Sequence, residues 1–550
     1  MAVLKLTLLH AVLAAGLPVT DANLDDRAPH HPFTVKTTSG MYAPYLSASS
    51  PSVASFLDIP YAQNPTGPLR FAPPVPLHRN GNDSVIYATE LPGACFQYTP
   101  PVLQGSIATE AEPSFLVQKG DFSGTTEDCL RLSIYAPKHT VERTSSKTTK
   151  KVNPGQQQRG LPVAVWIHGG GWSLGGNGVP YQVPANWVER SQAHIVVQVQ
   201  YRLDLLGQPN AAGLATLTND GTKNHNLNFG LLDQRLAVKW VRDNIANFGG
   251  DPSRITLWGQ SAGGYSTDSY LFAWAQDPIV SGVIANSGDA VAAPTFLSDA
   301  TNHTTFSTVA RGLGCGDLSP ADELACMRAV PASDIKAYIQ APLGAGGAAD
   351  EGLLFWPIVD NMTWFSDYPA LIASKKFPVH VPLLVSTLTN EGAALVPYDF
   401  PGSETATQIP AEYQPIADAF TSNLRCTVLR ETRLRVAAGA TTYRHLYAGN
   451  FTDISPRPWL GAYHTADLPL VFGTYGTEGP VTGSLEKRVS ERMQDLYLEF
   501  MRDPTNGLRK AGWPEVTGDL DKKDIMTFAA DGKVEQVVAG NRFGLGDECE

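Results

Sequence analysis

Short apolar runs separated by polar and glycine-rich segments mark the middle of this chain. The runs at 162–167, 255–258 and 381–386 predict buried strands, and 442–447 is strand-like. Residues 228–247 have apolar positions near helical spacing and are followed by two glycines, which predicts a helix that ends there. The pattern therefore indicates a sheet that is covered by at least one helix just before the strand at 255–258.

The residues after the run at 255–258 predict a nucleophile. Residues 259–263 read Gly-Gln-Ser-Ala-Gly and open into a segment that can be helical. A serine on a sharp strand-to-helix turn exposes its hydroxyl, and small neighbours let the backbone bend that tightly. We therefore expect Ser261 to act as the nucleophile, although the motif alone also occurs by chance in a glycine-rich chain.

A second glycine motif follows the predicted strand at 162–167. Residues 168–172 read His-Gly-Gly-Gly-Trp. Successive glycines let backbone N–H groups turn toward one point, as the stabilisation of a tetrahedral oxyanion requires. We expect the donors to be the N–H groups of Gly170, Gly171 and Ala262.

A serine hydroxyl needs a base, and in this arrangement the acid and then the histidine follow the serine in the chain. Only His303, His380, His445 and His464 come after Ser261. The first lies in a glycosylation sequon, the second precedes a strand, and the third lies inside the strand-like run at 442–447. His464 lies in a loop after that run, so we expect it to act as general base and then as general acid.

The acid that orients this histidine is expected at the end of another strand. Glu391 lies in the loop after the strand predicted at 381–386 and fits best. Asp360 and Asp467 remain alternatives.

Motifs spread over most of the chain resemble the type-B carboxylesterase and lipase family, which includes the cholinesterases. They comprise residues 56–62, 69–71, 127–130, 168–172, 228–264, 390–392, and 464 with 467–469. The resemblance implies an α/β-hydrolase fold, with a large and mostly parallel central sheet flanked by helices and with helical and loop insertions that form a substrate gorge. It also implies the triad Ser261, Glu391 and His464 and the oxyanion donors Gly170, Gly171 and Ala262.

The same resemblance implies two structural features. Arg70 and Glu127 would form a structural ion pair rather than catalytic groups. The six cysteines would pair as Cys95 with Cys129, Cys315 with Cys326, and Cys426 with Cys549.

Two departures from the cholinesterases limit the class of substrate that we expect. Cholinesterases usually have a glutamate before the nucleophile, and here the residue is Gln260. They also bind a quaternary ammonium against a tryptophan in the first disulfide loop. Between Cys95 and Cys129 this chain has only Phe96, Tyr98, Phe115 and Phe122 as aromatic candidates and no tryptophan. The expected small-molecule substrate is therefore a neutral or hydrophobic carboxylic ester, of acyl and alcohol sizes that the sequence leaves open, rather than a choline ester.

Composition and the N-terminal segment indicate export. Residues 1–22 read as a secretory signal peptide, and 23–550 are expected to form a single catalytic domain, because the motifs of one site extend from 168 to 464. No other segment is long and apolar enough to predict a membrane span. Six cysteines fit an oxidising compartment. The sequons predict glycosylation at Asn82, Asn302, Asn361 and Asn450.

The remaining segments predict no additional chemistry. Residues 138–160 are polar and basic and are expected to form a solvated insertion between strands. Residues 290–380 are expected to be mostly helical, over the mouth of the active site. The net charge of −12 and the lack of a nucleic-acid motif argue against nucleic-acid binding, and no cysteine–histidine cluster has metal-site spacing. Neither a cofactor nor a metal is expected.

The sequence therefore predicts a secreted serine hydrolase that cleaves carboxylic esters through an acyl-enzyme. An acyltransferase with the same triad is an alternative within enzymes. A non-catalytic binding protein is the alternative from another class, although every position of the triad is filled in this chain.

Overall fold

The structure is a computed structural model that describes residues 33–78, 84–101, 105, 124–145, 159–214, 227–476, 483–543 and 549. Phe33–Glu550 form one compact unit. The predicted signal peptide at 1–22 and the sequon at Asn82 lie outside the described residues.

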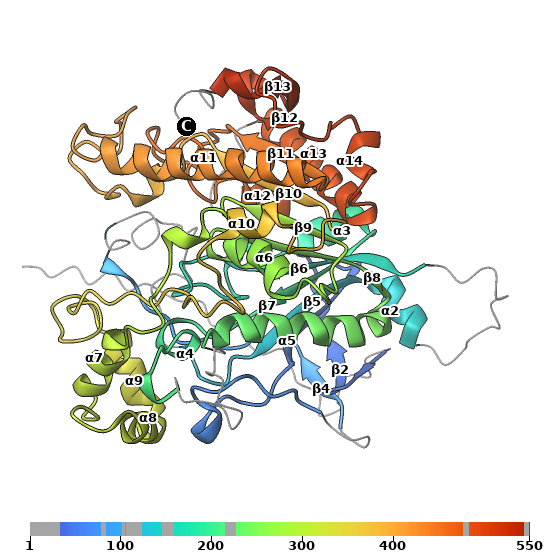
Figure 1. Cartoon of the computed structure of the whole chain (residues 1–550). Helices are drawn as coiled ribbons and strands as arrows, with labels where there is room; N and C mark the ends of the chain where they lie inside the picture. The colour runs from blue at the N-terminus through green and yellow to red at the C-terminus, as the bar shows by residue number, and fades with distance from the viewer. Residues whose placement is uncertain are drawn as a thin grey trace, which may run out of the picture. The chain divides into compact units, whose positions relative to one another are not determined.

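A mixed sheet of ten strands forms the centre of this unit (Figure 1). Its order is β13-β12-β11-β10-β9-β8-β6-β7-β5-β3. All neighbours from β7 to β12 are parallel, and the pairs β3–β5, β5–β7 and β12–β13 are antiparallel. The strands are β3 (Val53–Pro60), β5 (Arg131–Pro137), β6 (Leu161–Ile167), β7 (Ile195–Val199), β8 (Gly250–Gln260), β9 (Gly282–Asn286), β10 (Leu383–Leu388), β11 (Thr442–Tyr447), β12 (Lys523–Phe528) and β13 (Glu535–Ala539). A small separate sheet contains β1 (Val35–Thr37), β2 (Gly40–Pro44) and β4 (Ile86–Ala88).

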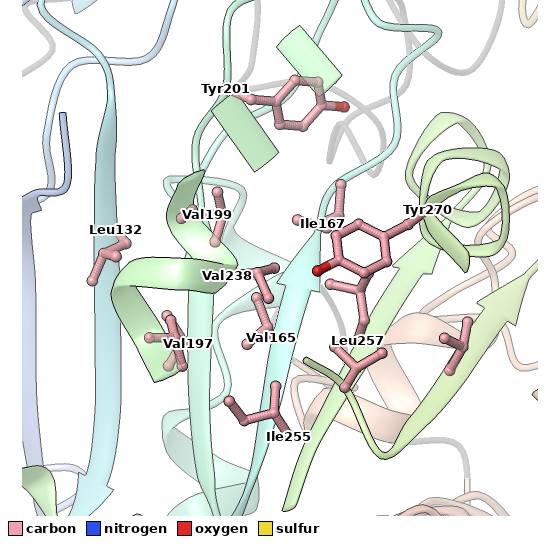
Figure 2. Close-up of a cluster of buried hydrophobic side chains, with 14 of the residues drawn as sticks. Leu132, Val165, Ile167, Val197, Val199, Tyr201, Val238, Ile255, Leu257 and Tyr270 are labelled. Atoms are coloured by element: carbon pink, nitrogen blue, oxygen red, sulfur yellow. The ribbon is translucent and has the colours of Figure 1, made fainter. Parts of the chain in front are cut away.

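The central strands are apolar on both faces, which is why helices cover both sides of the sheet. In β6, Val163, Val165 and Ile167 join one core cluster, whereas Ala164 and Trp166 join the other. Successive side chains of a strand point to opposite faces, so one run of apolar residues supplies both cores. Figure 2 shows the first cluster, in which β5, β6, β7 and β8 contribute aliphatic side chains.

Helices contribute to both cores. Those of the first cluster include α5, α6, α10 and α11, and those of the second include α3, α12 and α13. The helices of the described residues are α2 (Lys138–Ser145), α3 (Ala185–Ser191), α4 (Asp204–Gly207), α5 (Phe229–Asn244), α6 (Ala262–Ala273), α7 (Thr304–Gly312), α8 (Pro320–Ala329), α9 (Ala332–Ile339), α10 (Tyr368–Ala373), α11 (Gln414–Ala438), α12 (Leu468–Phe472), α13 (Ser484–Arg502) and α14 (Gly507–Lys510).

The predicted elements are confirmed with two corrections. The four strands and the helix at 228–247 are present as β6, β8, β10, β11 and α5. The prediction of mostly helical structure at 290–380 is wrong, because α7 to α10 cover fewer than half of these residues and the segments around Phe296 and Trp356 are loops. The prediction of a solvated insertion at 138–160 is wrong for its first part. Residues 138–145 form α2, in which Thr140 and Val141 are buried, because Val141 joins the first core. Residues 146–158 lie outside the described residues.

The order of the parallel strands determines where the predicted site residues meet. Strands β6, β8, β9, β10 and β11 are neighbours and point the same way. The segments that follow β6, β8, β10 and β11 therefore lie at the same edge of the sheet, where open α/β sheets bind ligands.

Candidate active site

Ser261 lies on a strained turn between β8 and α6. Its backbone has φ 54° and ψ −124°, a conformation that costs a residue other than glycine about 1–3 kcal/mol. The Ser261 N–H donates to the Asn286 carbonyl oxygen at 2.9 Å, and the Ser261 carbonyl accepts from the Tyr265 N–H at 2.9 Å. Strand β9 and the first turn of α6 therefore stabilise the turn from both sides.

The two glycines around Ser261 are required by close backbone contacts. A Cβ atom at Gly259 would lie 2.3 Å from the Gly263 carbonyl oxygen. A Cβ atom at Gly263 would lie 2.0 Å from the Ile167 carbonyl oxygen at the end of β6. Both distances are far below van der Waals contact, so only glycine lets the chain bend here.

The glycine loop after β6 lies against this turn. A Cβ atom at Gly169 would come within 3.1 Å of Ser261 Cβ. Gly170 and Gly171 have φ values of 105° and 63°, and within the described part of the chain neither N–H donates a hydrogen bond. Ala262 is the first residue of α6, where a backbone N–H has no acceptor in a preceding helical turn. All three residues line one cavity together with Ser261, so their N–H groups are available to a ligand there.

His168, at the start of the glycine loop, is a structural residue. Its Nδ1 lies 2.8 Å from the Gly169 carbonyl oxygen, and its ring stacks on Tyr201 at 4.5 Å between centroids. Burial lowers the pKa of His168 to about 4, so the ring is neutral near pH 7. Tyr201 also donates its hydroxyl to the His168 carbonyl, and together these contacts fix the start of the loop.

His464 and Glu391 form a hydrogen-bonded pair at the same edge of the sheet. His464 Nδ1 lies 2.6 Å from Glu391 Oε2, and the Glu391 side chain is fully buried. Glu391 Oε1 accepts hydrogen bonds from Ser287 Oγ and from the Leu388 N–H, each at 2.8 Å. Both carboxylate oxygens thus have donors, which is the arrangement that orients an imidazole through its Nδ1–H.

The second nitrogen of His464 faces the Ser261 turn. The amide nitrogen of Gln260, the residue before Ser261, lies 3.1 Å from His464 Nε2. Both Ser261 and His464 line the same cavity, although no hydrogen bond joins Ser261 Oγ to the imidazole among the described residues. Catalytic hydrogen bonds are often long without substrate and shorten when it binds.

The other histidines after Ser261 lie elsewhere. His445 is fully buried in β11, its Nε2 is 3.0 Å from the Tyr497 hydroxyl, and burial lowers its pKa to about 3. His303 precedes α7 and contacts the Asn210 carbonyl at 2.8 Å. His380 is exposed before β10. None of these three lines the cavity that contains Ser261.

The alternative acids also have other contacts. Asp360 accepts hydrogen bonds from backbone N–H groups of 362–364 and from the Thr363 hydroxyl, so it stabilises a turn. Asp467 is fully buried and accepts from Asn286 Nδ2 at 3.3 Å. Of these acids and Glu391, only Glu391 contacts the His464 ring within the described residues.

The cavity in front of Ser261 has a volume of about 310 Å³ and mostly apolar walls. Its larger side chains are Trp172, Leu174, Tyr265, Phe296, Leu354, Trp356, Leu395 and Phe420. Sequence reasoning missed most of these residues. Trp172 belongs to the glycine motif at 168–172, and Tyr265 lies one helical turn after Ser261, where i and i+4 share a helix face, so the motifs could have indicated these two.

The chain departs from the cholinesterases at Gln260 and in the aromatic residues between Cys95 and Cys129. Gln260 is 1% exposed, so a neutral amide lies beside His464. Phe96 and Tyr98 pack in a separate core cluster away from the cavity. Phe115 and Phe122 lie outside the described residues.

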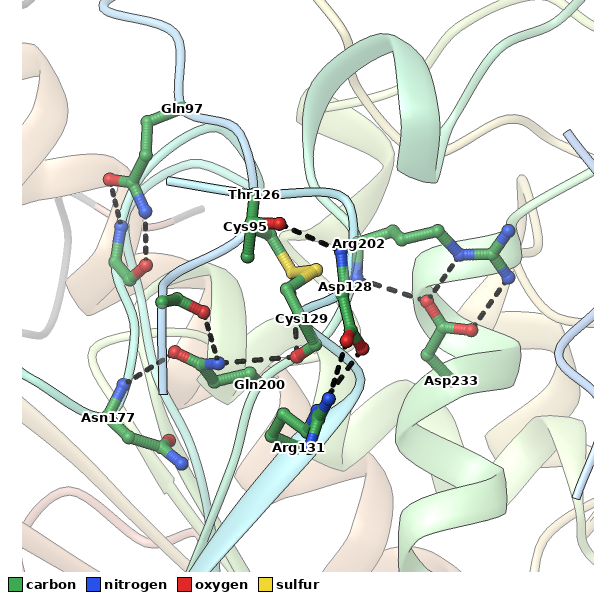
Figure 3. Close-up of a disulfide and its surroundings, with 12 residues drawn as sticks. Cys95, Gln97, Thr126, Asp128, Cys129, Arg131, Asn177, Gln200, Arg202 and Asp233 are labelled. Carbon is green, nitrogen blue, oxygen red and sulfur yellow. Dashed lines mark hydrogen bonds and ion pairs between the residues drawn. A yellow bond between two sulfur atoms is a disulfide. The ribbon is translucent and has the colours of Figure 1, made fainter. Parts of the chain in front are cut away.

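Three disulfides join the cysteine pairs that the family resemblance implies. They are Cys95–Cys129, Cys315–Cys326 and Cys426–Cys549. Figure 3 shows the first, with Gln200 donating to the Cys129 carbonyl at 3.2 Å.

The Arg70–Glu127 ion pair is also present and lies at the same loop. Its two hydrogen bonds measure 2.6 and 2.7 Å, and both side chains are 5% exposed. Arg70 additionally donates to the Val330 carbonyl after α8, so the pair links the loop to the helical segment.

The predicted glycosylation sites that the structure describes lie on the surface. Asn302, Asn361 and Asn450 are exposed, and glycosylation at these positions stays a prediction. Within the described ranges, no group of three or more acidic, histidine or cysteine side chains could hold a metal ion. No helix in these ranges is long and apolar enough to cross a membrane.

The chain is similar to known proteins along most of its length. Residues 37–418 match the carboxylesterase family. The chain is similar to Secreted lipase 5 of Gibberella zeae, at 57% identity over 94% of this chain and 93% of that protein. It is also similar to chlorogenic acid esterase of Aspergillus niger, at 38% identity with the same coverage of 94% and 93%, and to acetylcholinesterase of Bungarus fasciatus, at 25% identity over 91% and 83%. With a family match over most of its length, the chain belongs to the carboxylesterase family.

Proposed function

We propose that this protein is a secreted serine hydrolase that cleaves small carboxylic esters through an acyl-enzyme at Ser261. Family membership supports ester hydrolysis as the reaction. The observation that supports this site most strongly is the 2.6 Å hydrogen bond between His464 and buried Glu391, beside a strained serine turn that faces free backbone donors.

In the first half of the reaction, Ser261 Oγ attacks the ester carbonyl while His464 Nε2 takes its proton. Glu391 orients the imidazole and stabilises the positive charge that the ring gains. The carbonyl oxygen becomes an oxyanion, and the N–H groups of Gly170, Gly171 and Ala262 donate to it. Loss of one such donor typically costs about 2.7–4 kcal/mol of transition-state stabilisation.

His464 then gives this proton to the leaving alcohol, whose departure leaves the acyl group on Ser261. In the second half, water enters and attacks the acyl carbonyl while the imidazole takes its proton. His464 finally returns this proton to Ser261 Oγ as the acid is released. The residues named so far supply every proton transfer in this sequence.

The walls of the cavity support a neutral or hydrophobic substrate. The described residues that line it include no Asp, Glu, Lys or Arg, so a charged substrate group would find no acidic or basic side chain to pair with there. One relative is a secreted lipase and another a chlorogenic acid esterase, and their names support secretion and ester cleavage for this chain as well. The three disulfides fit an oxidising compartment.

Covalent labelling with an organophosphate tests this proposal. We expect one label per chain, on the peptide that contains Ser261, and loss of both label and ester hydrolysis in Ser261→Ala. A folded wild-type protein that takes no label would instead support a non-catalytic binding protein. Product analysis with a competing alcohol separates hydrolysis from acyl transfer, since an acyltransferase would form mainly the new ester.

A further inference from the structure

We propose that this enzyme selects esters of acids that carry an aromatic ring, and that Phe296 and Trp356 are the residues that determine this specificity. This inference rests on the proposed function, because it concerns the acid that is transferred to Ser261.

Phe296 and Trp356 form a corner in the cavity wall. Their ring centroids are 5.5 Å apart and their planes meet at 87°. Both side chains are only partly buried and both line the cavity. A flat ring that lies parallel to Phe296 is therefore perpendicular to Trp356, so it can stack on one ring and meet the other edge to face, which are the two arrangements that aromatic pairs prefer.

Two buried aromatic residues of the same cavity wall pack against Phe296. Tyr265 lies 5.2 Å from Phe296 and Trp172 lies 6.3 Å from it, measured between ring centroids. Trp172 donates its indole N–H to Ser266 Oγ at 3.0 Å, which fixes the orientation of its ring. Because these two residues are 3% and 1% exposed, Phe296 has little freedom to move away from a bound ring.

The reaction geometry assigns the corner to the acid rather than to the alcohol. His464 must protonate the leaving oxygen, so the alcohol lies on the imidazole side of Ser261, where Phe420 packs 5.4 Å from the His464 ring. The oxyanion faces Gly170 and Gly171. We therefore assign the acyl group to the remaining wall of the cavity, in which Phe296 contacts Tyr265, Trp172 and Trp356.

The size of the cavity agrees with a ring on a short linker. Its volume of about 310 Å³ is roughly twice the ~150 Å³ of an apolar protein cavity that binds benzene. The remaining space accommodates the ester group and a linker of a few carbon atoms.

A matched pair of ethyl esters tests the inference. Ethyl 3-phenylpropanoate and ethyl 3-cyclohexylpropanoate have the same alcohol, the same linker and nearly the same carbonyl reactivity, and they differ in whether the ring is flat and aromatic. One favourable pair of rings is worth roughly two- to tenfold in an equilibrium constant. With two ring partners in the corner, we expect kcat/KM to be about tenfold higher for the phenyl ester.

Burial of apolar area alone predicts the opposite order, because the cyclohexyl ring presents at least as much apolar surface. A ratio of one or less, with the cyclohexyl ester hydrolysed as fast or faster, would therefore overturn the inference.

Two variants test whether Phe296 and Trp356 cause the preference for the phenyl ester. Phe296→Leu and Trp356→Leu should each lower the phenyl-to-cyclohexyl ratio at least threefold, while hydrolysis of ethyl acetate, which has no ring, changes less. Phe365→Leu is the matched control, because Phe365 is also partly buried and has an edge-to-face partner, Tyr368, but does not line this cavity. An unchanged ratio in both corner variants contradicts the assignment to Phe296 and Trp356.

The outcomes separate this inference from the proposed function. A protein that hydrolyses no ester and takes no organophosphate contradicts the proposed function itself. A protein that takes the label and hydrolyses both esters without preference for the phenyl ring contradicts only the aromatic selectivity.

Discussion

Replacement of Glu391 by glutamine tests the central hydrogen bond of the proposed triad. The variant keeps the size of the side chain and removes its charge. Ser287 Oγ and the Leu388 N–H both donate to Oε1, so the glutamine oxygen is expected to keep that position. Its NH₂ group then faces His464 Nδ1, which in the wild type lies 2.6 Å from Oε2.

This exchange reverses the roles of the two imidazole nitrogens. A donor at Nδ1 favours the tautomer in which Nδ1 is unprotonated and Nε2 carries the hydrogen, and such a ring cannot accept the Ser261 proton. The corresponding change of aspartate to asparagine in a protease triad lowers kcat about 10⁴-fold. We expect a loss of about 10³- to 10⁴-fold here, which corresponds to about 4–5.5 kcal/mol of activation free energy.

Stopped-flow or steady-state hydrolysis of p-nitrophenyl acetate measures this loss, and circular dichroism checks that the variant is folded. Asp360→Asn and Asp467→Asn serve as matched controls, because each removes the charge of an alternative acid while keeping its size. A Glu391→Gln variant within tenfold of wild type, or a larger loss in either control, would refute the role of Glu391.

Three further predictions concern stability. Gly263→Ala should prevent folding or lower the free energy of unfolding by more than about 3 kcal/mol in urea titrations, because its Cβ would lie 2.0 Å from the Ile167 carbonyl oxygen; a wild-type midpoint would contradict the close contact. Burial raises the pKa of Asp467 to about 7, so the folded state keeps a proton that the unfolded state loses near pH 3.9, and stability present below pH 3.9 is lost as the pH rises to 7. Between pH 3.9 and about 7, the free energy of unfolding should fall less steeply with pH in Asp467→Asn than in the wild type. Equal slopes in the variant and the wild type would contradict a raised pKa of Asp467. Removal of the Cys426–Cys549 disulfide by the double change to serine opens a loop that spans 123 residues and should cost about 4–5 kcal/mol in the same titrations, whereas a loss below about 1 kcal/mol would argue that the cross-link constrains the unfolded chain little.

Local sequence patterns anticipated the elements that bear the site. The run before Ser261 and the glycines at 259 and 263 predicted a strand, a tight turn and a helix start, because close backbone contacts of this kind tolerate no side chain. Likewise, the strand-like run around His445 correctly placed that histidine inside the sheet and left His464 in a loop. The helix α2 was missed, because its polar sequence gives little apolar periodicity and only Thr140 and Val141 are buried.

Long-range contacts could not be read from such patterns. Glu391, Asp360 and Asp467 all follow or flank plausible elements, and only the packing of the loops after β10 and β11 shows which carboxylate touches the His464 ring. The contact of Gln260 with the same ring was also invisible, since the two residues are 204 positions apart.

The walls of the cavity also depend on long-range contacts that local sequence patterns do not predict. Phe296 and Trp356 lie 60 positions apart in segments that are neither strand nor long helix, yet their rings meet at 87° beside the Ser261 turn. By itself the sequence determined the strands, the glycine-dependent turns and the order of the candidate serine, acid and histidine, because these follow from local backbone geometry and the alternation of apolar side chains. Only the tertiary structure decided which acid meets the imidazole and which aromatic rings shape the cavity, because those contacts depend on how distant loops pack at one edge of the sheet.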